Sequence, residues 1–167
     1  MGAEEHKKQK VENLGFAIVT VSDSKTVETD SSGALIKELV EKAGHRVVSY
    51  DIVKDDKNEI YSETYRVLGG TEVSVVILCG GTGISHRDVT VETIKPMLHK
   101  ELTGFGEIFR VLSMKEIGSA AIMSRATAGV IDGKAVFCIP GSIGAVKLAM
   151  EKLILEECGH IIWEANR

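Results

Sequence analysis

The sequence predicts an α/β protein with the architecture of a three-layer sandwich, built on a mostly parallel sheet with one antiparallel strand. Short apolar runs alternate along the chain with segments whose apolar residues recur at helical spacing. The connections between these segments are short, which is typical of a single sheet wound together with its helices. Asp132-Gly133 lies between two apolar runs, and this dipeptide is a strong hairpin signal that predicts the antiparallel pairing.

The first half of the chain predicts three strands separated by two helices. Residues 14–21 are apolar and β-branched, which is typical of a buried strand. Residues 33–44 have apolar side chains at helical spacing, which predicts a helix. The polar residues 30–32 can cap the start of this helix, and Gly44 can cap its end. The pattern continues with a strand in 45–53, a helix over 57–70 that ends on glycine, and a strand in 73–79.

The second half continues the alternation. Residues 89–100 predict a helix that Thr90 could cap and that Pro96 bends or interrupts. Residues 104–118 are also helical in pattern, with a glycine at each end, whereas residues 119–126 are ambiguous. The remaining elements are the two strand-like runs within 126–139 and a long amphipathic helix over 142–159.

The composition is that of one ordinary globular domain. The 167 residues carry a formal net charge of −4, so the overall charge does not favour binding to nucleic acid or to an anionic membrane. No apolar run approaches the roughly 20 residues that a membrane span needs. The three cysteines lack zinc or redox spacing and predict reduced core thiols in a cytoplasmic protein. We expect residues 14–167 to form the domain and the polar residues 1–13 to form an arm, without a secretory signal, that can also dock on a neighbouring subunit.

Polar loops at the carboxyl ends of the predicted parallel strands form the candidate site, because ligands of such sheets bind beyond these ends. Gly80, Gly81 and Gly83 permit positive φ angles and let a ligand approach the backbone closely. Consecutive N–H groups at a strand-to-helix turn bind anions, and residues 140–142 at the start of the last helix can do the same. Two such loops at one edge suggest a ligand with more than one phosphate.

Nucleotidyl transfer requires cationic groups that neutralise phosphate and carboxylates that hold Mg²⁺. Asp55 and Asp88 are the candidate metal ligands, and Arg87 is the candidate phosphate partner. Each residue also has an ordinary interpretation: the glycines as turn residues, Asp55 as a turn residue, Asp88 as a cap or surface carboxylate, and Arg87 as a solvated cation. Their convergence on one edge of the sheet favours the functional interpretation.

Five segments carry a resemblance to a known family: VSDSKTVETDSSG, DIVKDD, CGGTGISHRDVTVE, MSRATAGV and IPGSIGAVKLA. In order and spacing they resemble the molybdenum cofactor biosynthesis proteins of the MoaB/MogA kind, and MoaB most. The G domains of plant molybdenum-insertion proteins and of gephyrin are similar. The resemblance covers about residues 14–158 and implies a molybdopterin-binding fold.

The resemblance also implies an activity, in which AMP passes from Mg-ATP to the terminal phosphate of molybdopterin and pyrophosphate is released. It implies that Asp55 and Asp88 are the catalytic aspartates and the Mg²⁺ ligands, that ATP and molybdopterin are the substrates, and that the protein is a homo-oligomer, either a trimer or a hexamer. The positions that match the family's substrate-binding and nucleotide-binding motifs are Ser22, Asp23, Gly80, Gly81, Thr82, Gly83, Ile84, Ser85, Arg87, Ser124, Arg125, Pro140, Gly141 and Ser142.

Two functions of different class remain open on the sequence. The first is a molybdopterin adenylyltransferase, and the second is a non-catalytic molybdopterin-binding or scaffold protein of the same pathway. Only the first requires both aspartates and the metal. A nucleotide-binding protein of unrelated purpose is a third.

The helical segment 104–118 has more apolar residues than one small contact requires. They either cover the sheet or mark a subunit interface, and they are Phe105, Ile108, Phe109, Leu112 and Ile117.

Overall fold

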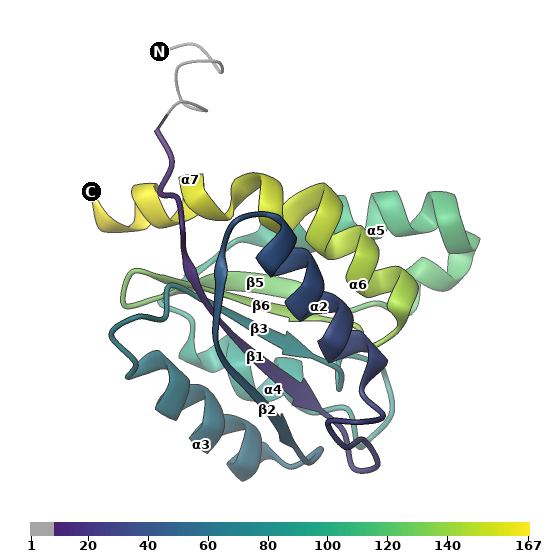
Figure 1. Cartoon of the computed structure of the whole chain (residues 1–167). Helices are drawn as coiled ribbons and strands as arrows, with labels where there is room; N and C mark the ends of the chain where they lie inside the picture. The colour runs from purple at the N-terminus through teal and green to yellow at the C-terminus, as the bar shows by residue number, and fades with distance from the viewer. Residues whose placement is uncertain (1–8) are drawn as a thin grey trace.

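Six strands form one sheet in the order β2-β1-β3-β6-β5-β4 in the computed structural model, which describes residues 9–167 (Figure 1). The strands β2, β1, β3 and β6 are mutually parallel, and β5 is antiparallel to both of its neighbours. The predicted sheet, mostly parallel with one antiparallel strand, is therefore confirmed. The strands are β1 (Gly15–Val21), β2 (Arg46–Val53), β3 (Val75–Cys79), β4 (Lys100–Glu101), β5 (Thr127–Ile131) and β6 (Lys134–Ile139).

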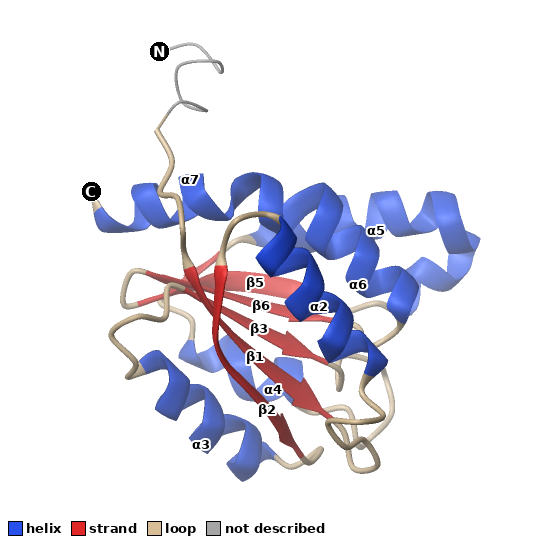
Figure 2. Ribbon diagram, viewed as in Figure 1, coloured by secondary structure: helices blue, strands red, loops and turns tan. Residues whose placement is uncertain are grey.

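Helices cover both faces of this sheet, as Figure 2 shows. One face carries α2 (Ser31–Lys42), α5 (Thr103–Ile117), α6 (Ile143–Ala149) and α7 (Leu155–Asn166), and the other carries α3 (Lys57–Leu68) and α4 (Thr90–Ile94). The three-layer sandwich predicted from the sequence is confirmed. Shorter helical segments are η1 (Lys95–Met97), η2 (Gly118–Met123) and the π-helical η3 (Met150–Ile154).

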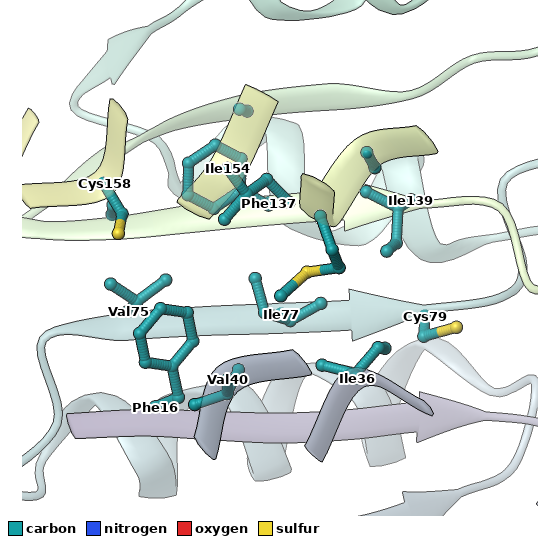
Figure 3. Close-up of a cluster of buried hydrophobic side chains, with 14 of the residues drawn as sticks. Phe16, Ile36, Val40, Val75, Ile77, Cys79, Phe137, Ile139, Ile154 and Cys158 are labelled. Atoms are coloured by element: carbon teal, nitrogen blue, oxygen red, sulfur yellow. The ribbon is translucent and has the colours of Figure 1, made fainter. Parts of the chain in front are cut away.

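Two hydrophobic cores result, one on each face, because successive side chains of a strand point to opposite faces of the sheet. In β1, Phe16 packs into the core under α2, whereas Ala17 packs into the core over α3. Figure 3 shows the larger core, in which Ile77 of β3 and Phe137 of β6 lie between Ile36 of α2 and the terminal helix. All three cysteines are free and buried, as predicted. The cytoplasmic location itself stays a prediction.

The first predicted helix has the start that its polar residues indicate. The carboxylate of Asp30 accepts the N–H of Gly33 at 3.0 Å and the hydroxyl of Tyr50 at 2.6 Å, so one buried side chain caps α2 and ties it to β2. Gly44 follows this helix with a φ of +83°, the left-handed conformation expected at a glycine-terminated end.

The segment 89–100 departs from its prediction as one helix. The α-helix α4 is only five residues long, and Pro96 lies in the 3₁₀ turn that follows it. The expectation that Thr90 caps this helix is wrong, because Val89 is the N-cap and the Thr90 hydroxyl instead donates to the carbonyl of Gly80 at 2.8 Å. The chain then forms β4, a two-residue strand too short to leave a sequence pattern.

The terminal helix is longer than predicted and is not α-helical throughout. Every fourth residue from 146 to 162 is buried, and in an α-helix a spacing of four drifts by about 40° per step around the axis. The wider π-helical turn at Met150–Ile154 takes up part of this drift and keeps the stripe on the sheet. The buried stripe consists of Val146, Met150, Ile154, Cys158 and Ile162.

The part of the polar N-terminal segment that the structure describes lies against its own chain. The N–H of Val11 donates to the carbonyl of Gly159 in α7 at 3.0 Å. A Cβ at Gly159 would come within 2.6 Å of the Val11 carbonyl oxygen, so the glycine permits this close approach. Residues 1–8 lie outside the described residues. Within residues 9–167, no helix is long and apolar enough to cross a membrane.

The apolar stripe predicted on residues 104–118 divides between two roles. Phe109 is 1% exposed and belongs to the core, and Phe105 and Leu112 pack against it, so for these three the interpretation as sheet cover holds. Four other side chains point outward and are 51–62% exposed. We call this set the α5 outer face, which consists of Ile108, Val111, Met114 and Ile117.

His45 joins the start of β1 to the terminal helix. Its Nδ1 accepts the N–H of Leu14 at 3.1 Å, so the ring carries its proton on Nε2, which lies 3.8 Å from Sγ of Cys158. Burial, and then the positive charge of Lys10, lower the pKa of His45 below its usual 6.5, and Glu12 opposes this shift. Protonation at Nδ1 would leave the Leu14 N–H facing a second donor.

We therefore expect the free energy of unfolding to fall as the pH drops below about 6.5. The unfolded chain takes up the His45 proton first, so this contribution to stability is complete above the usual pKa and is lost toward the lowered one. Urea unfolding at about pH 7.5 and about pH 5.5 should show a larger loss for the wild type than for His45→Asn. An equal loss in both proteins would contradict the assignment.

Candidate functional site

The glycine loop, which we define as Gly80–Ser85, leaves β3 among the carboxyl ends of three parallel strands. The N–H of Gly80 donates to the carbonyl of Ile139 at the end of β6, and a Cβ at Gly80 would lie 2.4 Å from the carbonyl oxygen of Val21 at the end of β1. The φ angles are +108° at Gly80 and +67° at Gly81. Only glycine fits these positions, so the predicted reason for the glycines, close backbone approach at positive φ, is present in the structure.

The second predicted loop, Pro140–Ser142, packs directly on the first. A Cβ at Gly141 would lie 3.5 Å from Cα of Gly80, and the carbonyl of Gly141 accepts the hydroxyl of Ser32 in α2 at 2.7 Å. Ser142 is the N-cap of α6, with its Oγ accepting the N–H of Ala145 at 3.3 Å. The two candidate phosphate-binding loops therefore form one continuous surface.

A hollow of about 250 Å³ lies between these loops and the end of α5. The loops contribute Gly81, Thr82 and Gly83 on one side and residues 140–142 on the other, and α5 and η2 contribute an apolar wall that includes Ile117 and Met123. Ser124 also lines this hollow. Within residues 9–167 its buried Oγ has no hydrogen-bond partner, and a buried polar atom of this kind favours a ligand at that position.

The two predicted catalytic aspartates border the glycine loop. Oδ2 of Asp88 accepts the N–H of Ser85 at 2.9 Å and lies 2.7 Å from the place where a Cβ at Gly83 would be. Oδ1 of Asp55 lies 3.3 Å from the corresponding place at Gly81. Segments 33 residues apart in the chain thus bring their carboxylates to the same short loop, as the sequence predicted.

The electrostatics of Asp55 suit a cation. Its pKa is raised above the usual value, first because the carboxyl is partly buried and then because Asp23 and Asp88 carry like charges. Asp55 and Asp88 offer the oxygen ligands that Mg²⁺ prefers, and Mg²⁺ in proteins commonly completes its shell with substrate phosphates and water. Within residues 9–167 no cluster of three His, Cys, Asp or Glu side chains is placed to hold a metal alone. The donor set therefore fits Mg²⁺ shared with a phosphate ligand.

The residues that follow β1 organise the same rim. Ser22 Oγ accepts the N–H groups of Ser24 at 3.3 Å and of Lys25 at 3.2 Å, which closes the turn after the strand. Oδ1 of Asp23 accepts the N–H of Asp55 at 3.2 Å, and its Oδ2 forms an ion pair with Arg87 that lowers the pKa of Asp23. Arg87, the predicted phosphate partner, is thus held beside Asp55 by a carboxylate.

Arg125 supports the glycine loop from behind. Its Nε donates to the carbonyls of Thr82 at 3.3 Å and Gly83 at 2.8 Å, and its Nη2 donates to the carbonyl of Asp88 at 3.4 Å. Glu92 of α4 forms an ion pair with the same guanidinium, and this hydrogen bond lowers the pKa of Glu92. Glu92 was not predicted as a site residue. The sequence does hold a signal for it, because Glu92 is the last residue of the family-like segment CGGTGISHRDVTVE and lies four residues after Asp88.

A second hollow, of about 400 Å³, lies on the outer side of the glycine loop. Its lining includes Lys57, Ile84, Ser85, Glu92 and Arg125, and Asp88 borders both this hollow and the first. Two larger hollows, of about 550 and 620 Å³, share His99 and Asp132 and lie by the β5–β6 turn, at the opposite edge of the sheet. They contain none of the predicted site residues.

Comparisons with known proteins agree with this geometry. A family profile described as "Probable molybdopterin binding domain" matches residues 17–160. The molybdenum cofactor biosynthesis protein B of Bacillus anthracis is 52% identical over 168 residues, covering 100% of this chain and 99% of the relative. The protein of the same name from Bacillus subtilis is 51% identical, with the same coverage of both chains.

Solved structures show the same relationship. A crystal structure of a molybdenum cofactor biosynthesis protein B matches with a TM-score of 0.91 and 52% identity, covering 93% of this chain and 98% of its own. The tungsten cofactor synthesizing protein MoaB from Pyrococcus furiosus matches with a TM-score of 0.86 and 41% identity, covering 94% and 99%. The chain therefore belongs to the MoaB/MogA family of molybdenum cofactor biosynthesis proteins and has the fold of that family.

Proposed function

We propose that this protein is a molybdopterin adenylyltransferase, which transfers AMP from Mg-ATP to the terminal phosphate of molybdopterin. One observation carries the proposal: the carboxylates of Asp55 and Asp88 border the same glycine loop at Gly81 and Gly83. A protein that only binds a pterin phosphate needs the N–H groups of this loop. It does not need carboxylates beside them, because these repel an anionic ligand unless a cation intervenes.

In the proposed reaction, an oxygen of the terminal phosphate of molybdopterin attacks the α-phosphorus of ATP. The new O–P bond forms as the bond between the α-phosphorus and its bridging oxygen breaks, and pyrophosphate leaves with that electron pair. Asp55 and Asp88 would hold Mg²⁺, which neutralises phosphate charge when it is bound. The exposed side chain of Arg87 can exchange Asp23 for a phosphate oxygen.

The backbone supplies the remaining contacts. None of the N–H groups of residues 81–84 donates to an acceptor within the described chain, so they are available to phosphate oxygens. The hollow between the loops is large enough for only part of a substrate, and Asp88 borders a second hollow beside it. If each hollow holds one substrate, the two substrates meet at Asp88. Transfer of AMP from one substrate to the other requires this proximity.

The test is incubation of the protein with molybdopterin, ATP and Mg²⁺, followed by detection of adenylylated molybdopterin and of pyrophosphate. Both products are expected in equal amounts, and omission of Mg²⁺ should abolish them. If molybdopterin binds but neither product forms, the protein is the non-catalytic binding or scaffold protein instead. Binding of ATP without binding of molybdopterin would indicate a nucleotide-binding protein of another purpose.

A further inference from the structure

Four consecutive carbonyl groups of the glycine loop, those of residues 80–83, are each held by a neighbouring side chain or backbone group. Thr90 holds two of them, since its hydroxyl donates to the carbonyl of Gly80 at 2.8 Å and its N–H donates to that of Gly81 at 3.1 Å. Arg125 holds the next two through Nε, at 3.3 Å for Thr82 and 2.8 Å for Gly83. Four consecutive carbonyls are therefore fixed in direction.

The direction of a carbonyl also sets the direction of the next N–H. A trans peptide is planar, and its C=O and N–H point to opposite sides, and none of the described peptide bonds is cis. The N–H groups of residues 81–84 therefore point away from Thr90 and Arg125. Gly81, Thr82 and Gly83 line the 250 Å³ hollow, whereas Thr90 does not and Arg125 lines only the second hollow, on the other side of the loop.

We infer that Arg125 is a positioning residue whose guanidinium, oriented by Glu92, turns the glycine-loop N–H groups toward the anion. Arg125 is not itself the anion's ligand. Its Nη2 donates to Oε2 of Glu92 at 3.2 Å and to the carbonyl of Asp88 at 3.4 Å, so its donors are directed at protein acceptors. This inference depends on the proposed function in one respect only, which is that the bound anion is a phosphate group of a substrate.

The two roles predict opposite effects for Glu92→Gln. If Arg125 were a ligand, loss of the Glu92 charge would free the guanidinium and leave anion binding equal or tighter. In the positioning role, the guanidinium loses its orientation and binding weakens. Arg125→Gln should weaken binding by about 10- to 100-fold, since it removes charged hydrogen bonds to several carbonyls. The double variant should bind the anion no more weakly than Arg125→Gln alone, because both changes disrupt the same Glu92–Arg125 hydrogen-bond network.

Inorganic pyrophosphate is the probe, and its binding to the full chain is followed by the amide resonances of residues 81–84. In the wild type these resonances should shift on titration, and Glu92→Gln and Arg125→Lys should both raise the dissociation constant. Lysine keeps the charge, but its donors lie on one nitrogen and cannot reproduce the planar fork through which Nε and Nη2 of Arg125 reach separate carbonyls. Glu101→Gln, which breaks the exposed Lys95–Glu101 pair, is the matched control and should bind as the wild type does. Thermal unfolding checks that each variant is folded.

Three outcomes would overturn the inference: unshifted wild-type amides, unchanged or tighter binding by Glu92→Gln, or full affinity in Arg125→Lys. Absence of adenylylated product from a wild type whose amides do shift would contradict the proposed function alone. Where turnover is measurable, Glu92→Gln should raise KM more than it lowers kcat, because the change acts on phosphate binding.

Discussion

Asp55→Asn and Asp88→Asn are each expected to lower the rate of molybdopterin adenylylation by at least about 100-fold, because metal-assisted charge neutralisation contributes several kcal/mol to the transition state. Both substitutions keep the size and the hydrogen-bond acceptor of the side chain. In Asp88→Asn the amide oxygen can still accept the N–H of Ser85, which the carboxylate accepts at 2.9 Å, so the loop is preserved. Product formation at saturating Mg-ATP measures the effect.

The neighbouring carboxylate provides a matched control. Asp56 is the N-cap of α3 and accepts the N–H groups of Asn58 and Glu59. Asparagine caps helices as well as aspartate does, so Asp56→Asn should keep wild-type turnover. Asp55→Asn should also unfold no earlier than the wild type without Mg²⁺, because it removes the repulsion that raises the pKa of Asp55. Wild-type turnover in either aspartate variant would remove that residue from the proposed metal site.

Val111→Glu is expected to convert an oligomer into a monomer. The α5 outer face exposes Ile108, Val111, Met114 and Ile117 side by side on one helix, and exposed apolar patches of this kind mark interfaces. We propose that this face joins subunits into a trimer, alone or doubled to a hexamer, since closed symmetry is common among soluble homo-oligomers. Burial of apolar surface at about 25 cal/mol per Å² drives the association, and a buried, unpaired carboxylate opposes it.

Light scattering should report about three or six times the 18.0 kDa chain mass for the wild type and 18.0 kDa for Val111→Glu at micromolar concentration. Tyr65→Glu is the control, because Tyr65 is 68% exposed but lies on α3, in the opposite layer. It should leave the mass unchanged. A monomeric wild type would disprove the assembly, and dissociation by Tyr65→Glu but not by Val111→Glu would place the interface elsewhere.

Local sequence patterns predicted most of the elements because their causes are local. The buried strands, the capping of α2 by Asp30 and the Asp132-Gly133 hairpin each depend on residues within one short segment. Predictions went wrong where a distant group competed for the same atoms. Thr90 has a side chain suited to an N-cap, but the carbonyl of Gly80, ten residues earlier, takes its hydroxyl instead. The two-residue strand β4 exists only because β5 lies beside it.

The candidate site shows the same division. The glycine loop, the PGS loop and the aspartates could be assigned to one edge from the sequence, because parallel strands place their carboxyl ends together. The pairing of Arg87 with Asp23 could not be predicted from the sequence, because these residues are 64 positions apart and each is an ordinary surface residue in its own segment. The sequence also could not show which apolar residues of 104–118 cover the sheet and which stay exposed. Only packing against the sheet determines that Phe109 is buried and Val111 is exposed.

By itself, the sequence determined the sandwich, the strand that runs against the others, and the edge of the sheet at which the loops that we propose as the phosphate site meet. Hydrophobic period, helix caps and glycine conformations carry that information over a few residues each. Only the tertiary structure decided what each polar side chain in those loops does. It directs Arg125 at the carbonyls of Thr82 and Gly83 and places Glu92 behind it. A hydrogen bond depends on two atoms within about 3 Å of each other, and a distance of that kind is set by the fold rather than by either segment alone.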